Sequence, residues 1–160
     1  CPNCKRKMSS KRLRSYEAGA LLGMRSVTVR NLPALFCPKC KGVVLEGALL
    51  DSLHEHLLLD ILANGSVLGG EEVRFIRKAL GLSQAALADR LGVHRVSVAR
   101  WESGEIPPDG PTSVAIRALA AIPLVSKPTK VKESRRVTES FEKPLTPPAA
   151  PGSYILDATG

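Results

Sequence analysis

Four cysteines constrain this chain more than any other feature of its sequence. They are Cys1 and Cys4 in CPNC, and Cys37 and Cys40 in CPKC, and the 160 residues contain no others. Two C-x-x-C units separated by a few tens of residues are typical of structural zinc sites, in which each pair forms a tight knuckle and two knuckles complete a tetrahedron of thiolates. We therefore expect one structural Zn²⁺ per chain, held by all four cysteines.

Other uses of the cysteines remain open from the sequence. Redox dithiols or disulfides need the same residue type, but a redox C-x-x-C is expected at the start of a helix in a βαβ setting, which neither pair has. Iron suits four thiolates as well as zinc does. Four protein ligands leave no position for water, so we expect a structural and not a catalytic metal. The sequence has no recognisable Ser/His/Asp arrangement, phosphate-cradling glycine loop or paired carboxylate motif, and we expect no enzymatic activity.

The chain is basic, with a formal net charge of +8. Residues 1–64 contain ten Lys/Arg against five Asp/Glu, residues 65–122 seven against six, and residues 123–160 six against four. Some cations of the first region, such as Lys5 and Lys41, lie beside the cysteine pairs and would offset the negative charge of a tetrathiolate site. The same cations could also bind a partner, and a basic chain favours polyanions, nucleic acid above all.

No apolar run approaches the roughly 18 residues of a membrane span. The richest stretch, LLLDIL, is interrupted by Asp60. No secretory signal is recognisable either. We therefore expect a soluble cytoplasmic protein without a membrane partner.

Residues 1–46 are expected to form a small β domain of the zinc-ribbon type. Val27 and Val29 alternate with polar residues, which is typical of a short strand. The segment has few large apolar side chains, so it needs a metal to fold. Residues 47–70 predict an amphipathic helix over 47–63, with leucines at helical spacing, followed by a glycine-rich linker.

Residues 71–122 predict four or five short helices, in line with an all-α domain of five helices. Ser83 is a suitable N-cap, and Gly92 stands where a helix should stop. Residues 123–160 lose the periodicity, contain six prolines and predict a mostly disordered tail with a short ordered patch at SYIL. The expected fold class is α+β: a Cys₄ β domain, a helix, a helical domain and a tail.

The most informative stretch is LGLSQAALADRLGVHRVSVARWESGEIPP. In a helix-turn-helix, two short helices cross near a tight turn, so the first needs a small residue, the turn a glycine and the second buried anchors. Ala88 and Gly92 fill the first two roles, and Val93, Val98 and Trp101 fill the third. Two generic antiparallel helices would not require these residue types at these offsets.

This stretch resembles the phage-repressor and Cro class of DNA-binding domains, the Xre family, on the motifs GLSQAALADRLGV and SVARWESG. The resemblance implies that the Gln opening the second helix helps to bind the DNA backbone. It also implies that exposed residues early on the third helix enter the major groove. The residues concerned are Gln84, His94, Arg95, Val96 and Arg100.

The chemistry of these residues favours some of them over others. Arg95 and Arg100 are the best donors to guanine O6 and N7. Val96 can at most meet a thymine methyl group, and His94 is expected to cap the helix or touch a phosphate. Residues 65–122 carry a net charge of only +1, so the domain must place a few cations well or dimerise, and a twofold homodimer on double-stranded DNA is expected.

A Cys₄ domain followed by such a helix-turn-helix resembles the MqsA-type antitoxins, also described as the YgiT-type zinc-finger family. CPNC, VTVRNLPALFCPKC and SVARWESG carry the resemblance over residues 1–122. It implies a bacterial antitoxin that represses its own operon and whose zinc domain binds a toxin, commonly an mRNA-cleaving ribonuclease. Val96 stands where the best-known members have a base-reading Asn, so a different operator is expected. A regulator of the same architecture without a toxin is the alternative.

Overall fold

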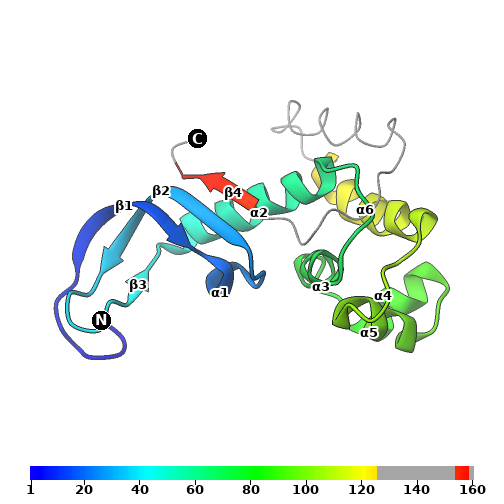
Figure 1. The fold of residues 1–160 in the computed structure, drawn as a ribbon, viewed down its shortest axis with the longest axis horizontal. Helices are drawn as coiled ribbons and strands as arrows, with labels where there is room; N and C mark the ends of the chain where they lie inside the picture. The colour runs from blue at the N-terminus through cyan, green and yellow to red at the C-terminus, as the bar shows by residue number, and fades with distance from the viewer. Residues whose placement is uncertain (126–153, 159–160) are drawn as a thin grey trace. The chain divides into compact units, whose positions relative to one another are not determined.

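The computed structural model of the protein describes residues 1–125 and 154–158, shown in colour in Figure 1. The described chain falls into two compact units, which divide after Leu57. The first unit also includes the C-terminal strand, and the second begins at Leu58. No described helix is long and apolar enough to cross a membrane.

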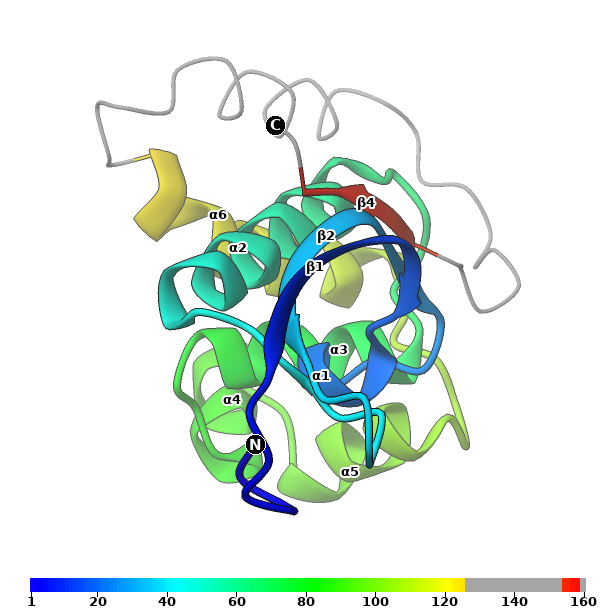
Figure 2. The same ribbon diagram turned by 90° about the vertical axis from the view of Figure 1, so that its left-hand side faces the viewer.

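The first unit is built on a mixed sheet of four strands. Its elements are β1 (Ser9–Glu17), α1 (Gly19–Leu22), β2 (Val27–Phe36), β3 (Val43–Val44), the start of α2 (Gly47–Ala63) and β4 (Tyr154–Asp157). Of the strands, β1, β2 and β4 are labelled in Figure 2. β2 lies at the centre and pairs antiparallel with β1 along its length. Its other edge pairs antiparallel with β3 at one end and parallel with β4 at the other.

The buried positions of β2 change phase at Asn31. Val27 and Val29 are buried before it, and Leu32 and Ala34 after it. Strict alternation cannot bury all four side chains, because successive strand residues point to opposite faces. Asn31 has a left-handed backbone with φ 54°, a conformation that Asn tolerates better than most residues, and this accommodates the change.

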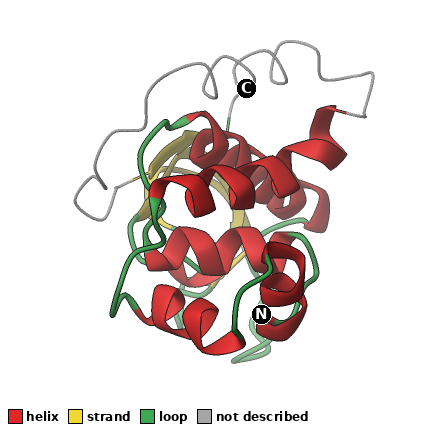
Figure 3. Cartoon of the chain, turned by 90° about the vertical axis from the view of Figure 1, so that its right-hand side faces the viewer, coloured by secondary structure: helices red, strands yellow, loops and turns green. Residues whose placement is uncertain are grey.

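The second unit contains four helices between Gly70 and Val125, against the four or five expected (Figure 3). They are α3 (Gly70–Ala79), α4 (Gln84–Leu91), α5 (Arg95–Ser103) and α6 (Gly110–Val125). The Ser83 side chain caps α4 by accepting a hydrogen bond from the amide of Ala86, and Gly92 ends α4 with φ 67°, both as predicted. Buried side chains from all four helices form the core: Val73, Phe75, Ile76, Leu87, Ala88, Val98, Trp101 and Ile116.

The segment 64–70, expected as a linker, is attached to α6. Arg117 is only 2% exposed, and its Nη2 donates to the carbonyl oxygens of Asn64 and Ser66. The amide of Leu68 donates to Ser113 Oγ at 3.3 Å. The two compact units divide earlier, after Leu57 inside α2. The domain ranges 1–46, 47–70, 71–122 and 123–160 stay predictions.

Two parts of the expected tail belong to the ordered structure. α6 continues through Pro123 to Val125, because a proline near the end of a helix removes only one backbone hydrogen bond and Leu124 still buries its side chain. The SYIL patch forms β4. The remaining tail residues, 126–153 and 159–160, lie outside the described residues.

Candidate metal centre and nucleic-acid interface

The four cysteines meet in one cluster, and all four Sγ atoms lie within 4.8 Å of one another. Sγ of Cys1 lies 3.4 Å from Sγ of Cys40, and Sγ of Cys4 lies 3.4 Å from Sγ of Cys37. A disulfide would need about 2.05 Å between sulfurs. A tetrahedron with Zn–S bonds of about 2.3 Å places its sulfurs about 3.8 Å apart. The cluster therefore fits one metal ion such as zinc, and all four cysteines are free thiols in the structure.

The two C-x-x-C turns have the same backbone construction. The carbonyl oxygen of Cys1 accepts a hydrogen bond from the amide of Lys5, and that of Cys37 accepts one from the amide of Lys41. Both lysines have left-handed backbones, with φ 57° and 59°. Each turn thus brings its two sulfurs to one side, which is the knuckle predicted from the spacing.

The pKa values of two cysteines shift in opposite directions. Hydrogen bonds from the Cys40 backbone and from the Cys4 thiol lower the pKa of Cys37 to about 7, although burial opposes them. The backbone of Arg6 lowers the pKa of Cys4, but donation to Cys37 and burial outweigh it, and the net shift is upward. Cys37 therefore ionises more readily than Cys4, and the thiolate is the form that binds metal.

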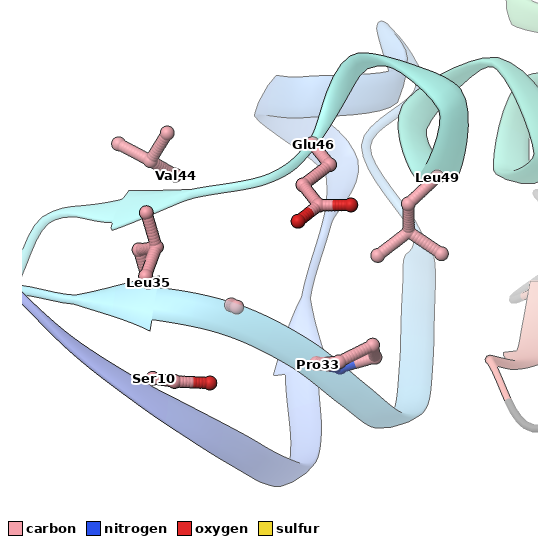
Figure 4. Close-up of a pocket in the computed structure, with 7 residues that line it drawn as sticks. Ser10, Pro33, Leu35, Val44, Glu46 and Leu49 are labelled. Carbon is pink, nitrogen blue, oxygen red and sulfur yellow. The ribbon is translucent and has the colours of Figure 1, made fainter.

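A shallow groove of about 140 Å³ opens on the sheet of the same unit (Figure 4). Pro33 and Leu35 of β2 line it together with Leu49 at the start of α2. Glu46 supplies the one ionisable side chain of the lining. The groove is apolar and separate from the cysteines, and its lining brings together no acid and base pair.

In the second unit, α4 and α5 form the helix-turn-helix around the left-handed Gly92. His94 is the N-cap of α5, and its Nδ1 accepts a hydrogen bond from the amide of Val96 at 3.3 Å, as expected for a capping histidine. Arg95 and Val96 follow on the first turn of α5, and both are exposed, Val96 by 55%. His94, Arg95 and Val96 therefore lie together at the accessible start of α5.

Arg100 is exposed on the same helix and has a carboxylate partner. Its Nε donates to Glu105 Oε1 at 2.9 Å, and its Nη2 lies 2.8 Å from the same oxygen. Gly104 ends α5 with φ 78°, which turns the chain so that Glu105 faces back toward Arg100. The guanidinium is thus held by an ion pair at the surface, where it is still accessible.

Glu102 was not singled out by the sequence, yet it joins three helices. Its carboxylate accepts hydrogen bonds from Arg77 Nε at 2.5 Å and Nη2 at 3.1 Å on α3, and from Gln84 Nε2 at 3.0 Å on α4. Burial alone would raise the pKa of Glu102, but these hydrogen bonds and the charges of Arg77 and Arg74 lower it overall. The ionised carboxylate therefore holds α3 and α4 against the end of α5.

Gln84, which the sequence predicts to contact the DNA backbone, also forms a hydrogen bond inside the protein. Its side-chain amide nitrogen donates a hydrogen bond to the carboxylate of Glu102, and this bond orients the Gln84 side chain at the start of α4. Helical periodicity shows which positions are polar but not which polar side chains pair across helices. The contacts of Glu102 with Gln84 and Arg77 therefore could not be predicted from the sequence. The contact of each of the five residues with DNA stays a prediction.

Comparisons with known proteins match this part of the chain. The helix-turn-helix family model HTH_3 matches residues 73–124. The HTH-type transcriptional regulator DicA of Escherichia coli (strain K12) is 34% identical over 79 residues, which cover 48% of this chain and 56% of that protein. Repressor protein C2 of Salmonella phage P22 is 40% identical over 55 residues, covering 34% of this chain and 26% of that protein.

The chain thus spans about half the length of the first relative and about a quarter of the second. The matched region coincides with the four helices of the second unit. Residues 73–124 therefore form a helix-turn-helix domain of the kind that the Xre-type regulators carry.

Proposed function

We propose that the chain is a transcriptional repressor that binds a specific duplex DNA operator as a homodimer. The observation that carries the proposal is a matched helix-turn-helix domain whose α5 leaves Arg95, Val96 and Arg100 accessible. One relative is named as a transcriptional regulator and the other as a repressor protein. The protein acts by binding and not by chemistry, in the bacterial cytoplasm and on the nucleoid when bound to DNA.

Each of the five residues has a role in this proposal. Arg95 and Arg100 donate to guanine edges in the major groove, and Val96 meets a thymine methyl group. Gln84 and His94 lie at the starts of α4 and α5, where polar groups contact phosphates and set the register of the protein on DNA. Glu105 holds the Arg100 guanidinium in place before DNA arrives.

Replacing Arg95 or Arg100 with alanine should weaken operator binding by about 1 to 3 kcal/mol, because each removes a base contact. The operator is first selected from a random duplex library with the unmodified protein. Each variant is then titrated against the selected duplex and a scrambled one at a fixed salt concentration. The loss should appear mainly on the selected duplex.

Lys78→Ala is the matched control, since it removes one exposed cation from α3, outside the helix-turn-helix. It should leave the ratio of specific to non-specific affinity unchanged. If Arg100→Ala binds the selected duplex as tightly as the unmodified protein does, Arg100 does not read bases. A monomer of the protein on a single half-site, measured by mass in solution, would contradict the dimer.

We further propose that the Cys₄ unit holds one structural zinc ion and binds a protein toxin of the mRNA-cleaving type, which makes the chain the antitoxin of a type II pair. The cysteine cluster with two matching knuckles supports the metal, and the basic side chains around it support a protein surface for a partner. The alternative, a stand-alone regulator, keeps the same metal and the same DNA site.

Purification of the chain from its native locus, with metal analysis of the same sample, separates the two proposals. A small protein co-purifying with the chain and about one zinc per chain supports the antitoxin. Zinc without a co-purifying protein supports the stand-alone regulator. Absence of bound metal from the folded chain would contradict the metal centre in both.

A further inference from the structure

The C-terminal strand β4 completes a sheet whose other strands lie near the start of the chain. β4 runs alongside β2 and parallel to it (Figure 1). Tyr154 lies opposite Val27, and Leu156 lies opposite Val29. The amide of Tyr154 donates to the Ser26 carbonyl at 2.8 Å. Residues 126–153 separate β4 in sequence from α6, so the strand reaches the sheet as a segment of its own.

The side chains of β4 alternate between the core and solvent. Tyr154 and Leu156 are 9% and 4% exposed, while Ile155 between them is 54% exposed. Their partners Val27 and Val29 are fully buried. Paired residues of neighbouring strands project to the same face, so Tyr154 and Leu156 extend the apolar layer that β2 begins.

A polar contact fixes the far end of the strand. Asn31 Nδ2 lies 3.2 and 3.4 Å from the two carboxylate oxygens of Asp157. The amide of Ala158 donates to the carbonyl of Arg30 at 3.0 Å. Asn31 is the residue whose left-handed backbone changes the phase of β2, so β4 ends beside this irregular position, with Asp157 opposite Arg30.

We propose that the edge of β2 from Ser26 to Asn31 is a peptide-docking site, and that residues 154–158 are its resident and exchangeable ligand. The site recognises an extended segment that places an aromatic residue, then an aliphatic residue two positions on, and then a carboxylate. Backbone hydrogen bonds supply affinity and the alternating pockets supply selectivity, as in other cases of strand addition. The inference does not depend on DNA binding.

The ligand is exchangeable because it is short and tethered. A parallel strand of four residues with two buried side chains has little binding surface of its own. Its occupancy depends on the local concentration that its covalent attachment to the rest of the chain provides. A separate peptide of the same pattern can then take its place when the resident strand is absent or weakened.

The test uses a fluorescent peptide with the sequence of residues 152–160, GSYILDATG, and fluorescence anisotropy. It is titrated into the full chain and into a chain that ends at Gly152. Saturable binding to the shortened chain is expected, with affinity for the full chain at least about tenfold weaker, since the tethered strand competes. No binding to a shortened chain that keeps its metal and melts cooperatively would overturn the proposal, as would equal affinity for both chains.

The full chain with Leu156→Ser provides a second acceptor if the shortened chain does not fold. Its resident strand lacks one anchor while the β2 edge is unchanged, so the peptide should bind it more tightly than the unmodified chain. Absence of any gain would overturn the proposal.

Two altered peptides test the recognition pattern. The Ile155→Ser peptide should bind like the unmodified one, because Ile155 faces solvent. The peptide with Tyr154→Ser and Leu156→Ser should lose binding by at least about tenfold. Equal losses for the two altered peptides would overturn the assigned pockets.

Discussion

Cys37→Ser should abolish metal binding and unfold the first unit. Cys37 is buried at the junction of β2 with the second knuckle, and its pKa is lowered to about 7 by hydrogen bonds from the Cys40 backbone and the Cys4 thiol. A structural zinc ion contributes on the order of 10 kcal/mol to the folding of a small domain, and three remaining thiolates would hold the ion far more weakly. Two measurements test this: the metal content per chain, and the loss of β-sheet structure followed by far-ultraviolet circular dichroism.

Lys39→Ser is the matched control for this prediction. Lys39 lies between Cys37 and Cys40 and is exposed, so its replacement should leave metal content and the melting transition unchanged. A Cys37→Ser chain that keeps one metal ion and an unaltered melt would show that the four cysteines do not act as one site. Chelation of the unmodified protein should reproduce the effect of the substitution.

Glu102→Ala should destabilise the second unit by about 3 to 5 kcal/mol, which is the usual cost of leaving one partner of a buried ion pair uncompensated. The substitution leaves Arg77, whose side chain is 13% exposed, without its carboxylate, and it leaves Gln84 without its acceptor. Urea unfolding followed by the fluorescence of Trp101, the one tryptophan of the chain, measures the loss.

Glu105→Ala is a control of the same residue type and charge. Glu105 also pairs with an arginine, but its side chain is 57% exposed, and exposed ion pairs contribute about 0 to 1 kcal/mol. If both substitutions cost the same, the buried network does not stabilise the helix-turn-helix.

Lowering the pH should destabilise the second unit through protonation of the Glu102 carboxylate. The pKa of Glu102 is lowered from its usual 4.5 by its hydrogen bonds to Arg77 and Gln84. A lowered folded-state pKa means that the stabilisation is complete above pH 4.5 and is lost as the pH falls through the lower folded value. The difference in stability between the unmodified chain and Glu102→Ala should therefore shrink below pH 4.5.

The parts of the fold that depend on local sequence could be predicted, and the reasons are visible in single residues. Two C-x-x-C spacings define the knuckles, because a turn of that length brings its sulfurs together wherever it occurs. Ser83 and Gly92 mark the ends of α4 through their own backbone and side-chain preferences. The helix over 47–63 follows from its periodicity and has the expected bounds.

The parts that depend on distant partners could not be predicted. Glu102 is one of several charged residues in its segment, and only the packing of α3 and α4 selects Arg77 and Gln84 as its neighbours. β4 is a short apolar patch in a proline-rich region, and nothing near it in sequence indicates β2 as its partner. The attachment of residues 64–70 to Arg117 is equally non-local, and the glycines, Asn64 and Ser66 of the segment predicted only a linker.

The position of β4 in the chain also sets an order of events during translation. The cysteines and β2 leave the ribosome before helices α3 to α6 of the second unit, and β4 emerges only after those helices. Domains generally fold as they emerge, so the part of the β2 edge that β4 will cover stays open while the rest of the protein is synthesised. An open edge of that kind can pair with other chains. Early metal capture by the cysteine knuckles would hold the unfinished sheet together until its last strand arrives.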